Sequence, residues 1–184
     1  MYNLYRKLFL KSNIIILIII SFFSFLINYY YSGLGTFPID TFFHYDSSAR
    51  ILKNELPIRD YWVVSGLIID AIQSIFFWIF GINWHAFVIH SSIFNLLLSL
   101  LVYSYFLNLG INKVTSLIFT LCFSTLAYTI SGTPFVDHHA IFFLLISSLL
   151  LIKAIRSEKN IFWFFLILFY FLSFFTKQVP AAYV

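Results

Sequence analysis

Apolar runs alternate with short polar segments along almost the whole chain. The first run covers 13–32 and contains no charged residue, and later runs cover 84–107, 114–131, 135–152 and 161–176. About 20 apolar residues form a helix that crosses the hydrocarbon core of a membrane, and shorter helices are accommodated by tilt or local thinning. The pattern therefore predicts five membrane-spanning helices.

The segment 62–81 is also apolar, but it contains Asp70. Gly66, Asp70, Gln73 and Ser74 fall on one face at helical spacing, which is typical of a helix that lies in the membrane interface. A charged aspartate near the bilayer centre costs about 2.5–3.5 kcal/mol on insertion scales. We therefore expect this segment not to cross.

The basic residues indicate the orientation of the chain. If 62–81 does not cross, seven of the 11 basic residues lie on one side and four on the other, whereas the balance reverses if it crosses. Because Lys and Arg accumulate in cytoplasmic loops, the first arrangement is favoured, with a cytoplasmic N-terminus. The cytoplasmic set is Arg6, Lys7, Lys11, Lys113, Lys153, Arg156 and Lys159.

Composition supports a membrane protein. Of the 184 residues, 61% are hydrophobic and 10% are charged, against about 25% charged in soluble domains. The net charge of +4 is assigned to topology-setting loop residues, and no nucleic-acid partner is expected because no basic stripe with stacking aromatics lies outside the apolar runs. Basic residues precede the first run as in a signal peptide, but Asn28 and three tyrosines follow it in place of a cleavage site, which indicates an uncleaved anchor.

The expected fold is an all-α polytopic transmembrane helical bundle, about five spans in a single domain over 1–184. An outer loop, 33–83, carries short interfacial helices, and the expected location is a bacterial-type inner membrane. Polar side chains within the spans are expected to hydrogen-bond between helices, as with His85, His90, Asn95 and Asn108. Most acidic residues and three histidines lie on the outer side: Asp40, Asp46, Glu55, Asp60, Asp70, Asp137, His44, His138 and His139.

The first candidate site lies in the outer loop, where 41–55 is predicted to be a short helix. Asp40 and His44 share a face of this helix, and a carboxylate beside a histidine can act as a general base. Alternatively, Asp46 and the Asp-His-His triplet at 137–139 could complete a divalent-metal site, although the spacing matches no known signature. A third interpretation makes Asp40 only a helix N-cap.

Three further features are candidates for substrate binding. The triplet 137–139 is costly to bury at the mouth of a span, although Asp137 can also serve as a helix cap. Lys177, at the outer end of the last run, is either a cation for a lipid phosphate or a snorkelling lysine. Arg59 has the same two interpretations, a phosphate ligand or an exposed ion pair with Asp60.

The order of these features resembles the N-terminal part of the C-type (GT-C) integral membrane glycosyltransferases. An anchor helix leads to an outer loop with an early Asp40 and a short helix. A Pro-x-Arg-Asp-aromatic turn at 57–61, an interfacial helix ending at 80–84 and a lysine-tipped span then follow. The chain is most similar in style to protein O-mannosyltransferases, aminoarabinose transferases and their bacterial relatives.

The resemblance implies transfer of a sugar from a polyprenyl-phosphate carrier to a lipid, glycan or protein acceptor at the outer face. Asp40 would orient or deprotonate the acceptor, with His44 and Asp46 compensating for the missing second acid, because Thr41 follows Asp40. Lys177 would lie near the carrier phosphate, and the Arg59–Asp60 turn would shape the loop. No cofactor is required, and a divalent metal is compatible with the site.

The family's proteins are usually longer, so we expect the chain to be the N-terminal fragment of a larger transmembrane domain. Ser65–Gly66 stands where the family often has two prolines. The alternative function is a non-catalytic membrane module for transport, lipid binding or assembly, in which Asp40 and Lys177 serve only as cap and snorkelling residue.

Overall fold

The computed structural model describes residues 2–35, 38–63, 66–157 and 159–182, and every named element within them is a helix. Ser65 and Glu158 lie outside these ranges. The elements are α1 (Tyr2–Tyr31), α2 (Pro38–Leu52), α3 (Leu67–Phe80), α4 (Trp84–Asn108), α5 (Lys113–Leu126), η1 (Tyr128–Ile130), α6 (Val136–Ser157), α7 (Asn160–Thr176) and α8 (Gln178–Ala181).

Each predicted apolar run forms a helix, which confirms the all-α class. Within the described residues, four helical segments are long and apolar enough to cross a membrane: Asn13–Tyr31, Trp84–Asn108, Lys113–Ile130 and Val136–Ser157. Helices α3 and α7 are apolar but shorter. The chain is therefore a helical protein with the composition of a membrane domain.

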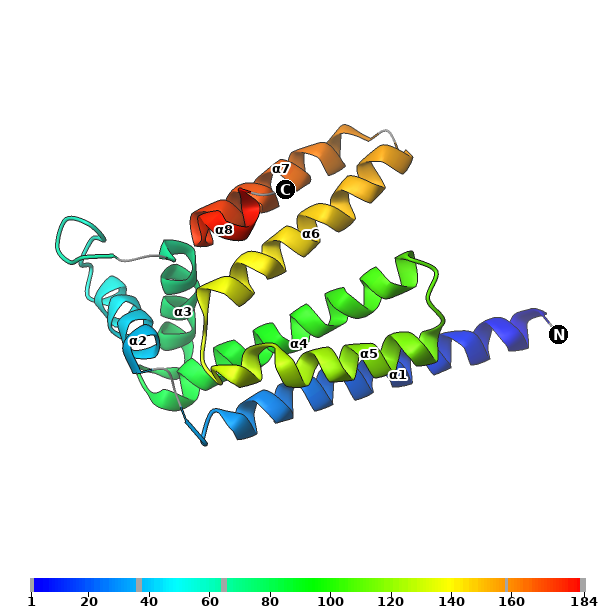
Figure 1. The fold of residues 1–184 in the computed structure, drawn as a ribbon, viewed down its shortest axis with the longest axis horizontal. Helices are drawn as coiled ribbons and strands as arrows, with labels where there is room; N and C mark the ends of the chain where they lie inside the picture. The colour runs from blue at the N-terminus through cyan, green and yellow to red at the C-terminus, as the bar shows by residue number, and fades with distance from the viewer. Residues whose placement is uncertain (1, 36–37, 64–65, 158, 183–184) are drawn as a thin grey trace.

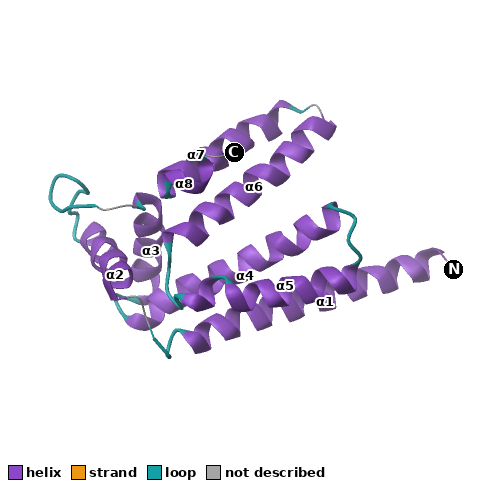
Figure 2. Cartoon of the chain, in the orientation of Figure 1, coloured by secondary structure: helices purple, strands orange, loops and turns teal. Residues whose placement is uncertain are grey.

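The long helices run alternately in opposite directions, and α2 and α3 lie across one of their ends (Figure 1). Connecting loops gather at the two ends (Figure 2). We call the end formed by 32–35, 38–63, 66–83, 127–137 and 176–182 the α2–α3 end. The opposite end contains the turn at 109–112, the end of α6 and the start of α7.

The long helices form two groups that meet at the α2–α3 end. Helices α1, α4 and α5 pack against one another, whereas α6 and α7 form a hairpin that contacts α3 and α4. Phe94 and Leu98 of α4 pack with Ala127 and Tyr128 in one core cluster. A second cluster joins α2, α3 and α4 and contains Ala49, Phe77, Ala86 and Phe87.

Asparagines fix the starts of two long helices. The side-chain oxygen of Asn83 accepts from the Ala86 backbone N–H at 2.9 Å, and that of Asn112 accepts from Thr115 at 3.0 Å. Each bond satisfies a backbone donor that the first helical turn leaves without an intrahelical partner. Both caps lie in short turns, so they set where α4 and α5 begin.

Polar side chains connect the long helices in three of the four predicted cases. The Asn95 amide of α4 donates to backbone oxygens of Ser24 in α1, at 2.8 Å, and of Ser124 in α5, at 3.2 Å. His85 and His90 also bond to other helices, through Tyr29 and Gln73. The prediction for Asn108 was wrong: its exposed amide donates to Ser104 in the same helix.

The polar face of α3 points into the protein. Asp70, Gln73 and Ser74 are buried against neighbouring helices, while Ile75 and Trp78 are 54% and 77% exposed. The predicted helix therefore exists, but its polar face meets protein partners where an interfacial helix would turn that face to water. Because the apolar face is left outermost, hydrocarbon can cover it without exposing the carboxylate of Asp70.

The Asn95 hydrogen bonds generate a stability prediction. We expect Asn95→Ala to lower the free energy of unfolding by about 1–2 kcal/mol, since two interhelical bonds are lost. Asn108→Ala, the matched control, should change it by less than about 0.5 kcal/mol because its bond lies within one exposed turn. Reversible unfolding in detergent measures both, and equal effects of the two substitutions would contradict a cross-helix role for Asn95.

Candidate functional site

A buried acid–histidine pair connects α2 to α3. His44 Nδ1 lies 2.7 Å from Asp70 Oδ1, and the two side chains are 4% and 0% exposed. Burial raises the pKa of Asp70, and the hydrogen bond and charge of His44 oppose that rise. Its other oxygen, Oδ2, has no hydrogen-bond partner among the described residues. The pair is therefore a buried acid–base group with one carboxylate oxygen left without a partner.

A chain of buried polar groups continues from the next turn of α3. The Gln73 side-chain oxygen lies 2.6 Å from His90 Nδ1, His90 Nε2 lies 2.9 Å from His139 Nε2, and His139 Nδ1 lies 2.7 Å from the Tyr128 hydroxyl. His139 Nδ1 also lies 3.0 Å from the Phe135 backbone oxygen, which can only accept a hydrogen bond. The direction of the bonds along this chain therefore depends on the tautomers of the two histidine rings.

A second charged pair lies where the first turn of α6 meets the end of α7. Lys177 Nζ is 2.6 Å from Asp137 Oδ1, and the side chains are 37% and 36% exposed. Asp137 lies in the first turn of α6, where a carboxylate also interacts favourably with the helix dipole. Lys177 follows the last residue of α7. Two predicted substrate-binding residues, 40 positions apart, are thus brought together.

Lys177 lines a pocket of about 390 Å³. Its wall consists of Gly66 and the segment Phe174–Val179, which includes Lys177. Gly66 has φ +77°, and a Cβ there would lie 2.4 Å from Val136 Cγ1 and 3.1 Å from His44 Cε1. Only glycine fits this position. The backbone of Gly66 therefore separates the pocket from the ring of His44.

The remaining outer-loop acids lie apart from this pocket wall. Asp40 is exposed in the first turn of α2, which begins at Pro38, so the N-cap interpretation was wrong. Asp46 is paired with Arg50 at 2.6 Å on the surface. Among the described residues, no group of three or more His, Cys, Asp or Glu side chains is arranged to hold a metal.

Arg59 and Asp60 form the exposed ion pair that was one of their two interpretations. The guanidinium donates to both carboxylate oxygens at 2.8 and 2.7 Å, and the Leu56 backbone N–H donates to the same carboxylate at 2.7 Å. These bonds, led by that of Arg59, lower the pKa of Asp60 to about 2. The pair lies in the segment between α2 and α3, and neither residue lines the pocket that contains Lys177.

His138 and His139, adjacent in sequence, point to different surroundings. His139 belongs to the buried polar chain, whereas the ring of His138 lies 4.4 Å from that of Tyr128 and its Nδ1 has no partner among the described residues. Sequence reasoning did not assign Gln73 or Tyr128 to a site. The available signal was that each is a polar residue within an apolar run near other polar residues.

The His44–Asp70 pair predicts a pH-dependent loss of stability on substitution. We expect His44→Leu to lower the free energy of unfolding by about 3 kcal/mol at pH 7, because a buried carboxylate loses its partner. The folded-state pKa of Asp70 lies above its ordinary value of 3.8, so this cost is absent below 3.8, grows as pH rises from 3.8 to the folded-state pKa, and is constant above it.

Unfolding of the variant between pH 4 and pH 8 measures this effect. The double variant with Asp70→Asn is the matched control, because it carries no carboxylate, and it should lose the extra pH dependence. If the single and double variants show the same pH profile, the burial of an ionisable Asp70 is disproved.

Comparisons of the chain with protein-family models, with curated proteins and with solved structures find no match.

Proposed function

We propose that the chain is the membrane-embedded part of a glycosyltransferase that takes a sugar from a polyprenyl-phosphate carrier. The observation that carries the proposal is the pocket with Lys177 on its wall, at one end of an apolar helical bundle. A lysine at the end of an apolar helix suits the phosphate of a lipid-linked donor, whose polyprenyl chain would lie against the apolar helices. The gathering of polar side chains at one end of apolar helices also supports the proposal.

The proposed topology has five spans with the N-terminus in the cytoplasm of a bacterial cell. Alternation of α1, α4, α5, α6 and α7 supports it, since four reversals bring all outer-loop candidates to one end (Figure 1). In this arrangement α2 and α3 lie at the outer surface. The sugar is transferred there to a lipid, glycan or protein acceptor.

The proposed reaction is a direct displacement. An acceptor oxygen attacks the anomeric carbon, the bond from that carbon to the phosphate oxygen breaks, and polyprenyl phosphate leaves. Lys177 stabilises the charge on the leaving phosphate, with Asp137 holding the ammonium in place. The acceptor proton is assigned to Asp40, which is exposed at the same end of the molecule but outside the lining of the Lys177 pocket. The ring of His44 and the backbone N–H of Asp70 contact Gly66 on the pocket wall. No metal is required for this sequence of steps.

Donor turnover tests the proposal. Membranes containing the protein are given polyprenyl-phosphate donors that carry a radiolabelled hexose, pentose or aminopentose, and release of the label from the donor is measured. We expect Lys177→Gln to slow turnover about 10- to 100-fold, the equivalent of one charge-assisted hydrogen bond. Lys53→Gln, an exposed cation at the same end, is the matched control and should have no effect.

Asp40→Asn separates the catalytic proposal from its non-catalytic alternative. It should slow turnover about 100-fold without weakening donor binding, because the residue acts on the acceptor. If the unsubstituted protein consumes no donor but still binds polyprenyl phosphate, the lipid-binding alternative is correct. If Lys177→Gln behaves as Lys53→Gln does, the phosphate role of this lysine is disproved.

Labelling of single cysteines tests the topology. In a Cys122→Ser background, Trp62→Cys should react with a membrane-impermeant maleimide in intact cells, since Trp62 is 81% exposed at the α2–α3 end. Leu109→Cys, at the opposite end and 60% exposed, should react only after the membrane is permeabilised. The reverse pattern, or equal labelling of both from outside, would rule out the five-span orientation.

A further inference from the structure

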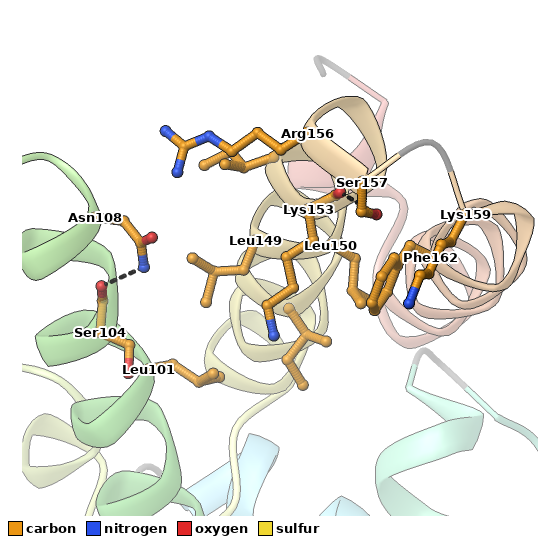
Figure 3. A pocket seen from close by; sticks show the side chains of 12 residues that line it. Leu101, Ser104, Asn108, Leu149, Leu150, Lys153, Arg156, Ser157, Lys159 and Phe162 are labelled. Carbon is orange, nitrogen blue, oxygen red and sulfur yellow. Dashed lines mark hydrogen bonds between the residues drawn. The ribbon is translucent and has the colours of Figure 1, made fainter.

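The opposite end of the molecule contains a larger pocket, far along the helices from Lys177. It has a volume of about 730 Å³ and is lined by residues of α4, α6 and α7 (Figure 3). The α4 wall consists of Leu101, Ser104 and Asn108. No step of the proposed transfer reaction uses this pocket, so it needs an explanation of its own.

The α6 wall changes from apolar to cationic as the helix approaches its end. Ile146, Leu149 and Leu150 are followed by Lys153 and Arg156, and all five line the pocket. These positions recur at intervals of three and four residues, so they form one stripe along the helix. Figure 3 shows Lys153 and Arg156 extending from α6 toward α4. The pocket therefore has an apolar interior and a positive mouth.

The other walls repeat this gradient. On α4, apolar Leu101 gives way to Ser104 and then Asn108 toward the same end. At the start of α7, the N-cap residue Lys159 is followed one turn later by Phe162, with Lys153 Nζ 6.0 Å from the centre of the Phe162 ring. The groove therefore changes polarity along the direction in which the long helices would cross a bilayer.

The positive charge at the mouth of the pocket favours an anionic ligand. The ion pairs among the described residues leave Lys153, Arg156 and Lys159 without a carboxylate partner. Lys153 precedes the last residue of α6, Ser157, by four positions, which at about 1.5 Å per residue places it roughly 6 Å from the helix end. That is the depth of lipid headgroups when the helix spans a bilayer.

We propose that this pocket binds one anionic phospholipid of the surrounding leaflet. The phosphate lies between Lys153 and Arg156, with Lys159 at the rim, and an acyl chain follows the apolar stripe of α6. Basic pockets between transmembrane helices on the cytoplasmic side are the sites where anionic headgroups bind. The apolar wall selects a lipid over a soluble phosphate, because a small anion would leave that wall exposed.

Native mass spectrometry of the full protein in a neutral detergent tests the proposal. The probes are phosphatidylglycerol and phosphatidylcholine with identical acyl chains, and glycerol 3-phosphate as the headgroup alone. We expect phosphatidylglycerol to be retained in preference to phosphatidylcholine. Lys153→Gln and Arg156→Gln should each reduce this preference about five-fold, the effect of one basic residue at a membrane surface.

Two further variants separate a site from general attraction to positive charge. Lys113→Gln removes a cation at the same end but outside the pocket, and it should leave the preference unchanged. Ser104→Trp fills the groove from α4 without altering charge, and it should abolish retention. Ser104 is exposed, so this substitution is compatible with folding.

Several results would overturn the proposal. Equal retention of the two lipids, equal effects of Lys113→Gln and Lys153→Gln, or retention that survives Ser104→Trp would each do so. Competition by glycerol 3-phosphate at the same concentration would identify a soluble anion as the ligand. Exclusion of lipid by a further helix in a longer form of the protein would also disprove it. Loss of donor turnover has no bearing on these outcomes, because the two sites lie at opposite ends.

Discussion

The absence of water from a membrane interior is the constraint on which the rest of this structure depends. Every polar side chain within the apolar bundle has to find a partner in the protein or leave a costly unpaired group. Asn95 meets backbone oxygens of two other helices, and Gln73, His90, His139 and Tyr128 are linked in a single chain. These bonds join helices that apolar packing alone would position less specifically. The Gln73 amide nitrogen and the Asn95 side-chain oxygen have no hydrogen-bond partner among the described residues.

The same constraint separates the two ends of the molecule. At the α2–α3 end, two of the acidic groups are paired and partly or wholly withdrawn from solvent, in His44–Asp70 and Lys177–Asp137. At the opposite end, cations line an open apolar pocket whose described residues include no carboxylate. The first arrangement suits discrimination of a particular ligand, and the second suits capture of a common anionic headgroup from the bilayer.

The sequence predicted the helices well because hydrophobic runs and their polar boundaries are local signals. It also predicted which residues gather at one end, since alternation of direction follows from the number of helices. It did not predict that the polar face of α3 points inward, because amphipathicity alone does not say whether protein or water meets that face. The pairing of Lys177 with Asp137 depends on how α6 packs against α7, which no local pattern contains.

The residues that form these buried polar contacts are synthesised in a fixed order. Residue 44 leaves the ribosome before 70, residue 73 before 90, and 90 before 139, so each bond waits for a later segment. Until residue 90 of α4 has been made, the side-chain oxygen of Gln73 lacks the ring that it contacts in the structure. The polar chain is therefore complete only when α6 has supplied His139, so its first members are synthesised long before their partners.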